Sequence, residues 1–467
     1  MVLGGGLYGT AFVLAGAGVA THSLPLLYAG NVLAGISYGC VYTPPIQALL
    51  DWFPDKRGLA SGVVIAGFGS GALFFTPAMN HFIQQFHQLP TYLGSSLKTI
   101  TEGGKQYANM DGQLTEVVYA TAGDLAKLPF SGLSEGFYVV GSGNTGVGTG
   151  LMAMGAIYGA VVMGSAMAIR RPAAGYLPAG YAPPANERAA SSVNVSNVMK
   201  TPQFWLLFST STLLATGGMG LISVAKPMMS DLFATSMPEL VTVSFASSYV
   251  MAMAVGNLGG RIGWAALSDK IGRRNTFNIF TFGAVPIFSC LPFCINQVVT
   301  NPTGPLAPAY LGLFVASTVA SVSILGGVLA VLPAYEADLY GPKYVQAIHG
   351  RFLVCASLST VAGPTILLTL RKMSEKAALQ DLLAKVDPAK FQGHFGVDVS
   401  QANSLIEAKT LTISKLMTIM PPGTLDPSPF IYNNTMYTMA GLVGVASVLH
   451  FMVKPVDKKY FEKTDNL

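Results

Sequence analysis

Long apolar runs, separated by short polar turns, recur along almost the whole chain. A helix needs roughly 20 apolar residues to cross a membrane, and the chain offers ten such segments. They cover residues 3–21, 26–50, 58–83, 145–169, 203–226, 243–267, 275–298, 308–334, 345–370 and 431–453. This pattern predicts an all-α polytopic membrane protein.

Three longer polar segments interrupt the apolar runs. Residues 170–200 are rich in proline, which is typical of an extended linker between two halves of a protein. We therefore predict two helical bundles joined by this linker, which is expected to be cytosolic. The N-terminal bundle covers 1–169 with an outer loop at 84–140, and the C-terminal bundle covers 201–467 with an outer loop at 371–430.

Composition agrees with a membrane location, and the positive charges set the orientation. Hydrophobic residues make up 51% of the chain and charged residues only 10%, against roughly 25% charged residues in soluble domains. Lys and Arg gather in the loops 51–57, 170–200, 268–274 and 341–351 and after residue 453, whereas the opposite short loops hold none. Because positive loops stay in the cytosol, we expect a cytosolic C-terminus, in the plasma membrane or in an organelle membrane.

The two halves of the chain share a repeated unit. Each has a proline near the end of one span, a short charged turn, and a Gly/Ala-rich span that ends in another proline. The first copy runs from Pro44 to Pro77 and the second from Pro333 to Pro364. Parallel copies of a helical unit explain this pattern, with chance spacing of prolines as the alternative.

The repeat predicts two helices that the first half does not show. In the second half, a helix pair precedes the turn at Asp269, which lies 69 residues before Asp338. Counting 69 residues back from Asp55 leads to a point before Met1, so the first half does not show the corresponding pair. The repeat asks for six helices in each half, so we expect that ten of twelve are present and that the first two are missing. A protein that has only ten spans is the alternative.

Two sequence motifs resemble motifs of a known protein family. Gly263-x-x-x-Leu-Ser-Asp269-Lys-x-Gly-Arg-Arg274 resembles the cytosolic signature loop of the major facilitator superfamily. Trp52-Phe-Pro-Asp-Lys-Arg-Gly-Leu-Ala-Ser-Gly62 resembles the fourth–fifth helix region of its oxalate:formate antiporter and monocarboxylate porter branch. The resemblance implies a two-bundle fold that moves a small organic anion by alternating access.

Arg261 is the main candidate for binding that anion. It lies eight residues before Asp269, or about 12 Å along a helix. We therefore expect its Cα atom to lie inside the membrane. An intramembrane arginine costs at least ~2.5 kcal/mol and marks a functional site by default, and its planar fork matches a carboxylate. In the resembled branch, an arginine at this place holds the substrate carboxylate. The alternative is a cation paired with an acid from a neighbouring helix.

Three further residues complete the predicted substrate site. Tyr38 and Tyr42 lie four residues apart on one helix face, and tyrosines of this helix line the cavity in the resembled branch. Packing or interfacial anchoring is the alternative for both. Asn257 lies one turn before Arg261 and could orient its guanidinium.

Charged residues at the cytosolic helix ends are predicted to form a gate. Carboxylates and cations at such ends can pair in one conformational state and part in another. The predicted gating residues are Asp269, Arg273, Arg274, Asp55, Arg57 and Asp338. Topology anchoring by positive charge is the alternative.

These observations predict a secondary transporter of a monocarboxylate or an oxalate- or formate-like anion, and not an enzyme. No catalytic residue, metal site or cofactor is expected, because the sequence shows no nucleophile elbow, phosphate loop or metal-ligand spacing. The expected partners are the bilayer, the anion and a coupling proton or counter-anion, but no nucleic acid, and the functional unit is expected to be a monomer. A receptor that senses a carboxylate without moving it is the rival.

Overall fold

The computed structural model divides the chain into two compact units. It describes residues 1–102, 105–110, 113–120, 133–173, 175–181, 192–395, 397–407 and 411–462. The first unit comprises Met1–Pro44 and Gly71–Arg170, and the second comprises Pro45–Ser70 and Arg171–Leu467. The change at Arg170 falls at the start of the predicted linker. Residues 45–70 join the second unit because they are hydrogen-bonded to its helices.

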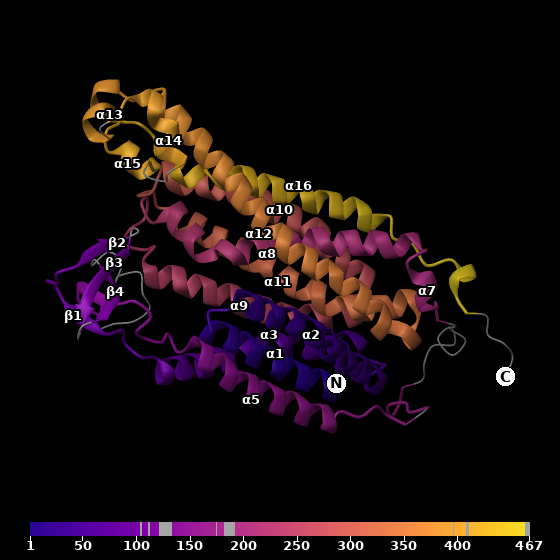
Figure 1. The fold of residues 1–467 in the computed structure, drawn as a ribbon. Coiled ribbons are helices and arrows are strands. Elements are labelled where there is room, and N and C mark those ends of the chain that lie inside the picture. The colour runs from indigo at the N-terminus through magenta and orange to yellow at the C-terminus, as the bar shows by residue number, and fades with distance from the viewer. Residues whose placement is uncertain are drawn as a thin grey trace. The chain divides into compact units, whose positions relative to one another are not determined.

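Each of the ten predicted spans forms a helix, so the all-α membrane class is confirmed (Figure 1). The helices are α1 (Val2–Ala20), α2 (Leu24–Trp52), α3 (Arg57–Phe86), α5 (Val147–Ala168), α8 (Pro202–Phe233), α9 (Val243–Ile271), α10 (Arg273–Thr300), α11 (Ala307–Tyr340), α12 (Val345–Leu383) and α16 (Asn433–Phe451). Among the described residues, eight helical segments are long and apolar enough to cross a membrane. The segments α9 and α16 are not among the eight.

Small residues let α1 and α5 of the first unit pack closely. A Cβ added at Gly9 would lie 2.8 Å from the carbonyl oxygen of Gly155, and one added at Gly16 would lie 2.9 Å from the backbone nitrogen of Met152. Backbones that approach this closely leave no room for larger side chains, which is how membrane helices pack in the absence of a hydrophobic driving force.

The outer loop of the first unit holds a β-sheet that the sequence analysis does not predict. Its strands are β1 (Tyr92–Gly94), β2 (Ile100–Glu102), β3 (Lys105–Met110), β4 (Gln113–Ala120) and β5 (Gly136–Val139). They are antiparallel, in the order β1-β5-β4-β3-β2. The strands are short and mostly polar, so their alternation of side chains is hard to distinguish from loop sequence.

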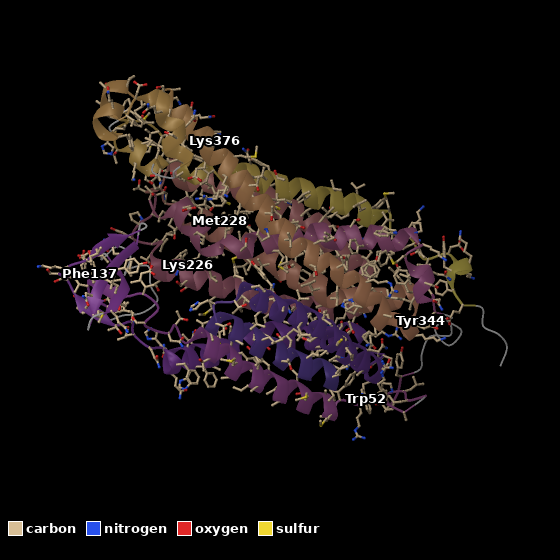
Figure 2. The ribbon with its side chains drawn as sticks, viewed as in Figure 1. Trp52, Phe137, Lys226, Met228, Tyr344 and Lys376 are labelled. Atoms are coloured by element: carbon tan, nitrogen blue, oxygen red, sulfur yellow. The ribbon has the colours of Figure 1, made fainter. Side chains whose placement is uncertain are left out.

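The second unit is a bundle in which α9 and α11 cross at glycines. A Cβ at Gly260 would overlap the carbonyl oxygen of Ser323, and one at Gly326 would overlap that of Asn257. Along another side of the bundle, α16 lies beside α8 and α10 (Figure 1). Helix α8 buries Met228 in the bundle and exposes Lys226, as Figure 2 shows.

The end of this bundle that is predicted to face outward is tied together by charged groups. Helix α12 continues to Leu383, beyond the predicted end at 370. There the guanidinium of Arg371 donates to Asp231 of α8 and to the Tyr432 hydroxyl before α16, both at 2.9 Å. The short helices α13 (Pro388–Phe395), α14 (Ala402–Glu407) and α15 (Ile413–Met417) follow α12.

The C-terminal segment is anchored to the other end of the bundle. Glu462 accepts hydrogen bonds from Lys343 at 2.8 Å and from the Tyr344 hydroxyl at 2.7 Å. Beside it, Phe461 pairs with Val193, which comes just before the short helix α7 (Val195–Val198). These contacts fix the chain that leaves α16.

We expect Glu462→Gln to release this segment. Hydrogen bonds from Lys343 and Tyr344 hold the pKa of the Glu462 carboxyl below its usual value. A lowered pKa means that the tether is complete at neutral pH and is lost as the pH falls below about 4.3 and through the folded-state pKa. Limited proteolysis near the C-terminus should therefore be faster in Glu462→Gln than in the unsubstituted protein at pH 7. Equal rates at pH 7 would contradict this account.

Candidate functional site

Arg261 lies in the middle of the second unit and is held on two sides. Its Nε donates to Asn257 Oδ1 at 2.9 Å, and its Nη1 donates to the carbonyl oxygen of Ile65 at 2.7 Å. Asn257 is one turn earlier on α9, whereas Ile65 belongs to α3. The guanidinium is thus fixed in orientation by its own helix and by the backbone of a second helix.

This guanidinium lines a cavity of about 310 Å³. Apart from Arg261 and Asn257, the cavity has walls of glycine and apolar side chains. The other lining residues are Gly69, Met219, Ile222, Ala225, Val250, Met253, Ala254, Leu258, Leu325 and Leu329. A single cationic fork facing an apolar chamber is an arrangement that binds a small anion with an apolar body, because charge pairing is strong in a site of low dielectric.

We expect Gly69→Ala to reduce anion uptake by about tenfold, since small displacements of a binding group are costly. A Cβ at Gly69 would lie 3.0 Å from both Cζ and Nη1 of Arg261, so the guanidinium would have to move. The matched control is Gly67→Ala, whose Cβ would meet no atom within 4 Å. Uptake by reconstituted vesicles checks the pair, and equal activity of the two variants would contradict this reading of the cavity.

The two predicted tyrosines lie in the first unit. Their rings are 5.2 Å apart between centroids. Tyr42 is buried, with 5% of its surface exposed, whereas Tyr38 is 42% exposed. Asn257 is therefore the predicted partner that the structure brings to Arg261, and the roles of Tyr38 and Tyr42 stay predictions.

Asp269, at the end of α9, caps the start of α3. Its two carboxylate oxygens accept hydrogen bonds from the backbone N–H groups of Gly58 and Leu59, both at 2.8 Å. The first N–H groups of a helix have no partner within it, and a negative charge there also meets the positive end of the helix dipole. The same carboxylate pairs with Arg273 at 2.5 Å. Asp269 is thus the centre of a contact between the start of α3 and the α9–α10 turn.

A second set of contacts joins this cluster to α11. Asp338 lies 3.7 Å from Arg273 Nε and 3.9 Å from Arg57 Nη1. Ser61 donates to the carbonyl oxygen of Ala330 at 2.7 Å. The structure therefore brings together four of the predicted gating residues: Arg57, Asp269, Arg273 and Asp338. Arg274 and Asp55 are exposed, and Asp55 forms no ion pair with any residue in the described part of the chain.

We expect Asp269→Asn to weaken this cluster strongly. An amide keeps one acceptor but turns an NH₂ group toward a backbone N–H of α3, and it loses the charge that pairs with Arg273. A charge-assisted hydrogen bond contributes about 1.5–3 kcal/mol, so the equilibrium between the formed and the broken contact should shift about tenfold to a hundredfold toward the broken one. Labelling of a cysteine introduced at Ser61, buried in the structure, should become faster.

The control for this substitution is Glu239→Gln, the same acid-to-amide change at an exposed position outside the cluster. Its labelling rate should match that of the protein with Asp269 intact. If Asp269→Asn also left the rate unchanged, the contact would have no role in closing this end.

The sequence analysis missed a buried acid. Glu336 of α11 is fully buried, and its two carboxylate oxygens lie 3.0 and 3.1 Å from Nδ1 of His349 on α12. The available signal was a lone acid at the end of an apolar helix, which is expensive unless it is paired. The predicted span stopped at residue 334 and so left Glu336 outside the membrane segment. The pair joins α11 to α12.

Metal binding has no support in the described residues, where no group of three or more His, Cys, Asp or Glu side chains could hold an ion. The cavity at Arg261 offers a guanidinium, an amide and apolar walls.

Comparisons with known proteins point to the same family as the sequence motifs. A family model described as Major Facilitator Superfamily matches residues 1–97. The oxalate:formate antiporter of Oxalobacter formigenes is 26% identical over 362 residues, which cover 76% of this chain and 66% of that protein. Apicoplast pyruvate carrier 1 of Toxoplasma gondii is 24% identical over 377 residues, which cover 78% of this chain and 62% of that protein.

A shorter match is to monocarboxylate transporter 12 of Mus musculus, 33% identical over 87 residues, or 18% of this chain and 17% of that protein. The chain spans less than two thirds of the length of the first two relatives. With its apolar helices, it is an integral membrane protein. The resemblance seen in the sequence is confirmed: the chain is similar to members of the major facilitator superfamily, among them an oxalate:formate antiporter and monocarboxylate-type transporters.

Proposed function

We propose that the protein is a secondary transporter that carries a small monocarboxylate by alternating access, with Arg261 as the group that binds the carboxylate. The observation that carries this proposal is the guanidinium of Arg261 in the wall of an otherwise apolar cavity. Its hydrogen bonds to Asn257 and to Ile65 orient the fork before an anion arrives, which lowers the cost of binding.

The size and charge of the cavity favour a monoanion. About 310 Å³ suits a molecule of a few heavy atoms. Of the residues that line it, Arg261 alone is charged. The second carboxylate of oxalate would enter without a counter-charge and would be costly to desolvate. Formate, lactate and pyruvate fit this reasoning better, and one of the relatives described above is named as a pyruvate carrier.

Alternating access is supported by the contacts of Asp269. They join the start of α3 to α9 and the α9–α10 turn through hydrogen bonds and ion pairs that can break without disrupting a hydrophobic core. When these contacts break, the start of α3 is free to move away from α9 and α11. In this proposal, the protein works as a monomer in the plasma membrane, with its C-terminus in the cytosol. Transport of the carboxylate is coupled to a proton or to a counter-anion.

The test is uptake by proteoliposomes that contain the purified protein. Radiolabelled formate, lactate, pyruvate and oxalate are supplied outside, each with and without the same anion inside. Monocarboxylate uptake that exceeds oxalate uptake supports the proposal, and acceleration by internal anion identifies exchange. Binding of a carboxylate without uptake would replace the transporter by a receptor. Neither binding nor uptake of any of the four would reject the proposed substrate class.

A further inference from the structure

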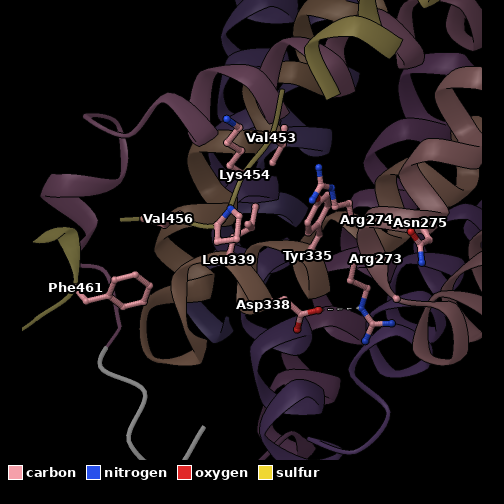
Figure 3. A pocket seen from close by; sticks show the side chains of 12 residues that line it. Arg273, Arg274, Asn275, Tyr335, Asp338, Leu339, Val453, Lys454, Val456 and Phe461 are labelled. Carbon is pink, nitrogen blue, oxygen red and sulfur yellow. Dashed lines mark ion pairs between the residues drawn. The ribbon is translucent and has the colours of Figure 1, made fainter. Parts of the chain in front are cut away.

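A second, larger cavity lies at the end of the second unit that is predicted to face the cytosol. Its volume is about 520 Å³. It is enclosed by the start of α10, the last turns of α11 and the chain that leaves α16, as Figure 3 shows. The lining residues used below are Arg273, Arg274, Lys454, Asp338, Tyr335 and Phe461. None of them lines the cavity at Arg261.

Positive charge dominates this second cavity. Arg273, Arg274 and Lys454 line it together with a single acid, Asp338. Asp338 pairs with Arg273 at 3.7 Å (Figure 3). Arg274 and Lys454 are exposed. After the pairing of Asp338, two positive charges remain to attract an anion.

The start of α10 adds backbone donors to these charges. Gly272 precedes the helix and offers no side-chain cap, and Gly272, Arg273, Arg274 and Asn275 all line the cavity. The first N–H groups of a helix bind anions readily. A second observation points the same way: Arg273 is only 8% exposed, yet its Nε has no hydrogen-bond acceptor among the described residues. The carboxylate of Asp338 lies 3.7 Å from this Nε, too far for a hydrogen bond, so the N–H of this cavity-lining residue is a donor available to a ligand.

The remaining walls are apolar and fixed in place. Tyr335, Leu339, Val456 and Phe461 also line the cavity. The segment that carries Val456 and Phe461 is held by Glu462, whose carboxylate binds Lys343 and Tyr344. The cavity therefore joins an anion-binding corner to an apolar surface, and it is larger than an inorganic ion requires.

We propose that this cavity binds a phosphomonoester-bearing molecule, with the phosphate at Arg274, Lys454 and the start of α10. A phosphomonoester carries about −1.5 to −2 charges at neutral pH, which matches two unpaired cations better than a carboxylate does. The apolar wall accommodates the organic group. The phosphate can belong to a soluble metabolite or to a lipid headgroup, since anionic lipids of the cytosolic leaflet are attracted to basic groups at this depth.

Occupancy of the cavity would also act on the gate. Arg273 lines the cavity and at the same time binds Asp269 and Asp338. A phosphate beside Arg273 competes with these carboxylates for the guanidinium, so it would alter the rate of transport. This consequence rests on the proposed function, whereas the binding of phosphate does not.

The test measures binding to the purified, full-length protein. In detergent and at constant ionic strength, inorganic phosphate and glycerol 3-phosphate are titrated calorimetrically, with acetate as the comparison anion. We expect both phosphates to bind more tightly than acetate. The double variant Arg274→Gln/Lys454→Gln should weaken phosphate binding by about tenfold or more, because two nearby charges are lost. Both side chains are exposed, so the fold should survive.

The matched control removes two exposed cations outside the cavity, Lys200→Gln/Lys458→Gln. Its affinity for phosphate should stay within about twofold of the parent, as expected for screened surface charges. Equal weakening in the two double variants would overturn the proposal, because attraction by the general surface charge would then suffice.

A second arm separates the two sources of phosphate. The protein is reconstituted in phosphatidylcholine nanodiscs that contain phosphatidic acid, and bound lipid is counted by native mass spectrometry. Retention of phosphatidic acid by the parent but not by Arg274→Gln/Lys454→Gln, without binding of soluble phosphate, identifies a lipid headgroup site. Binding of the soluble probes identifies a metabolite site. Absence of both overturns the proposal. Neither arm requires transport, so a protein that binds phosphate but moves no carboxylate would reject the proposed function alone.

Discussion

Replacing Arg261 by lysine should reduce carboxylate uptake by about a hundredfold, while the protein still reaches the membrane. The guanidinium reaches Asn257 and Ile65 at once and still lines the cavity. A lysine ammonium is a compact point charge that cannot reproduce a planar fork. The loss of charge-assisted, bidentate contacts accounts for roughly 3 kcal/mol, which corresponds to about a hundredfold in rate.

The measurement is initial uptake of labelled formate or pyruvate by proteoliposomes with matched protein content. Arg171→Lys is the control, since it makes the same change at a side chain that is 59% exposed and outside the cavity. Its uptake should equal that of the parent. Full uptake by Arg261→Lys would remove this residue from the binding site.

Glu336→Ala should lower the stability of the second unit more than any of the other substitutions discussed above. Glu336 is fully buried and pairs with His349, whose side chain is 3% exposed. Removal of one partner of this buried carboxyl–imidazole pair leaves the other polar group without compensation, which costs about 1–3 kcal/mol, and truncation to alanine also leaves a cavity among buried side chains. The pair also joins α11 to α12, so its loss should loosen that contact. Thermal unfolding in detergent should show a clearly lower midpoint.

A double substitution tests whether pairing is the cause. In Glu336→Leu/His349→Phe, both polar groups are replaced by apolar side chains of similar size, and such replacements are often close to neutral. The double variant should therefore be more stable than Glu336→Ala. If the double variant were less stable than Glu336→Ala, Glu336 would stabilise the protein through something other than its pairing with His349.

The pattern of apolar runs along the sequence was sufficient to locate the ten long helices. Helix boundaries in the structure differ from the predicted ones mostly by a few residues, because membrane-length apolar runs leave the backbone few alternatives. The exceptions are α8, α11 and α12, which end 7, 6 and 13 residues beyond their predicted ends, and the β-sheet between α3 and α5. All of them lie where the chain leaves the apolar runs, so hydropathy no longer constrains it.

The candidate site was only partly accessible from the sequence. Arg261 and Asn257 share one helix face, so their contact followed from helical spacing. The carbonyl of Ile65 and the close approach of Gly69 could not be predicted, since they come from α3, whose position against α9 depends on tertiary packing. Glu336 was missed because the predicted span ended at residue 334, and its pairing with His349 of another helix could not be predicted from spacing.

The sequence by itself determined a chain of membrane helices, one of which carries Arg261, and it placed charged residues at the helix ends, because these features depend on local hydrophobicity and spacing. Tertiary structure decided which groups meet. It brought the Asp269 carboxylate to the backbone of α3, placed Arg261 in the wall of an otherwise apolar cavity, and paired Glu336 with His349. Such contacts join residues far apart in the chain, and their geometry is set by how the helices pack at glycines such as Gly260 and Gly326.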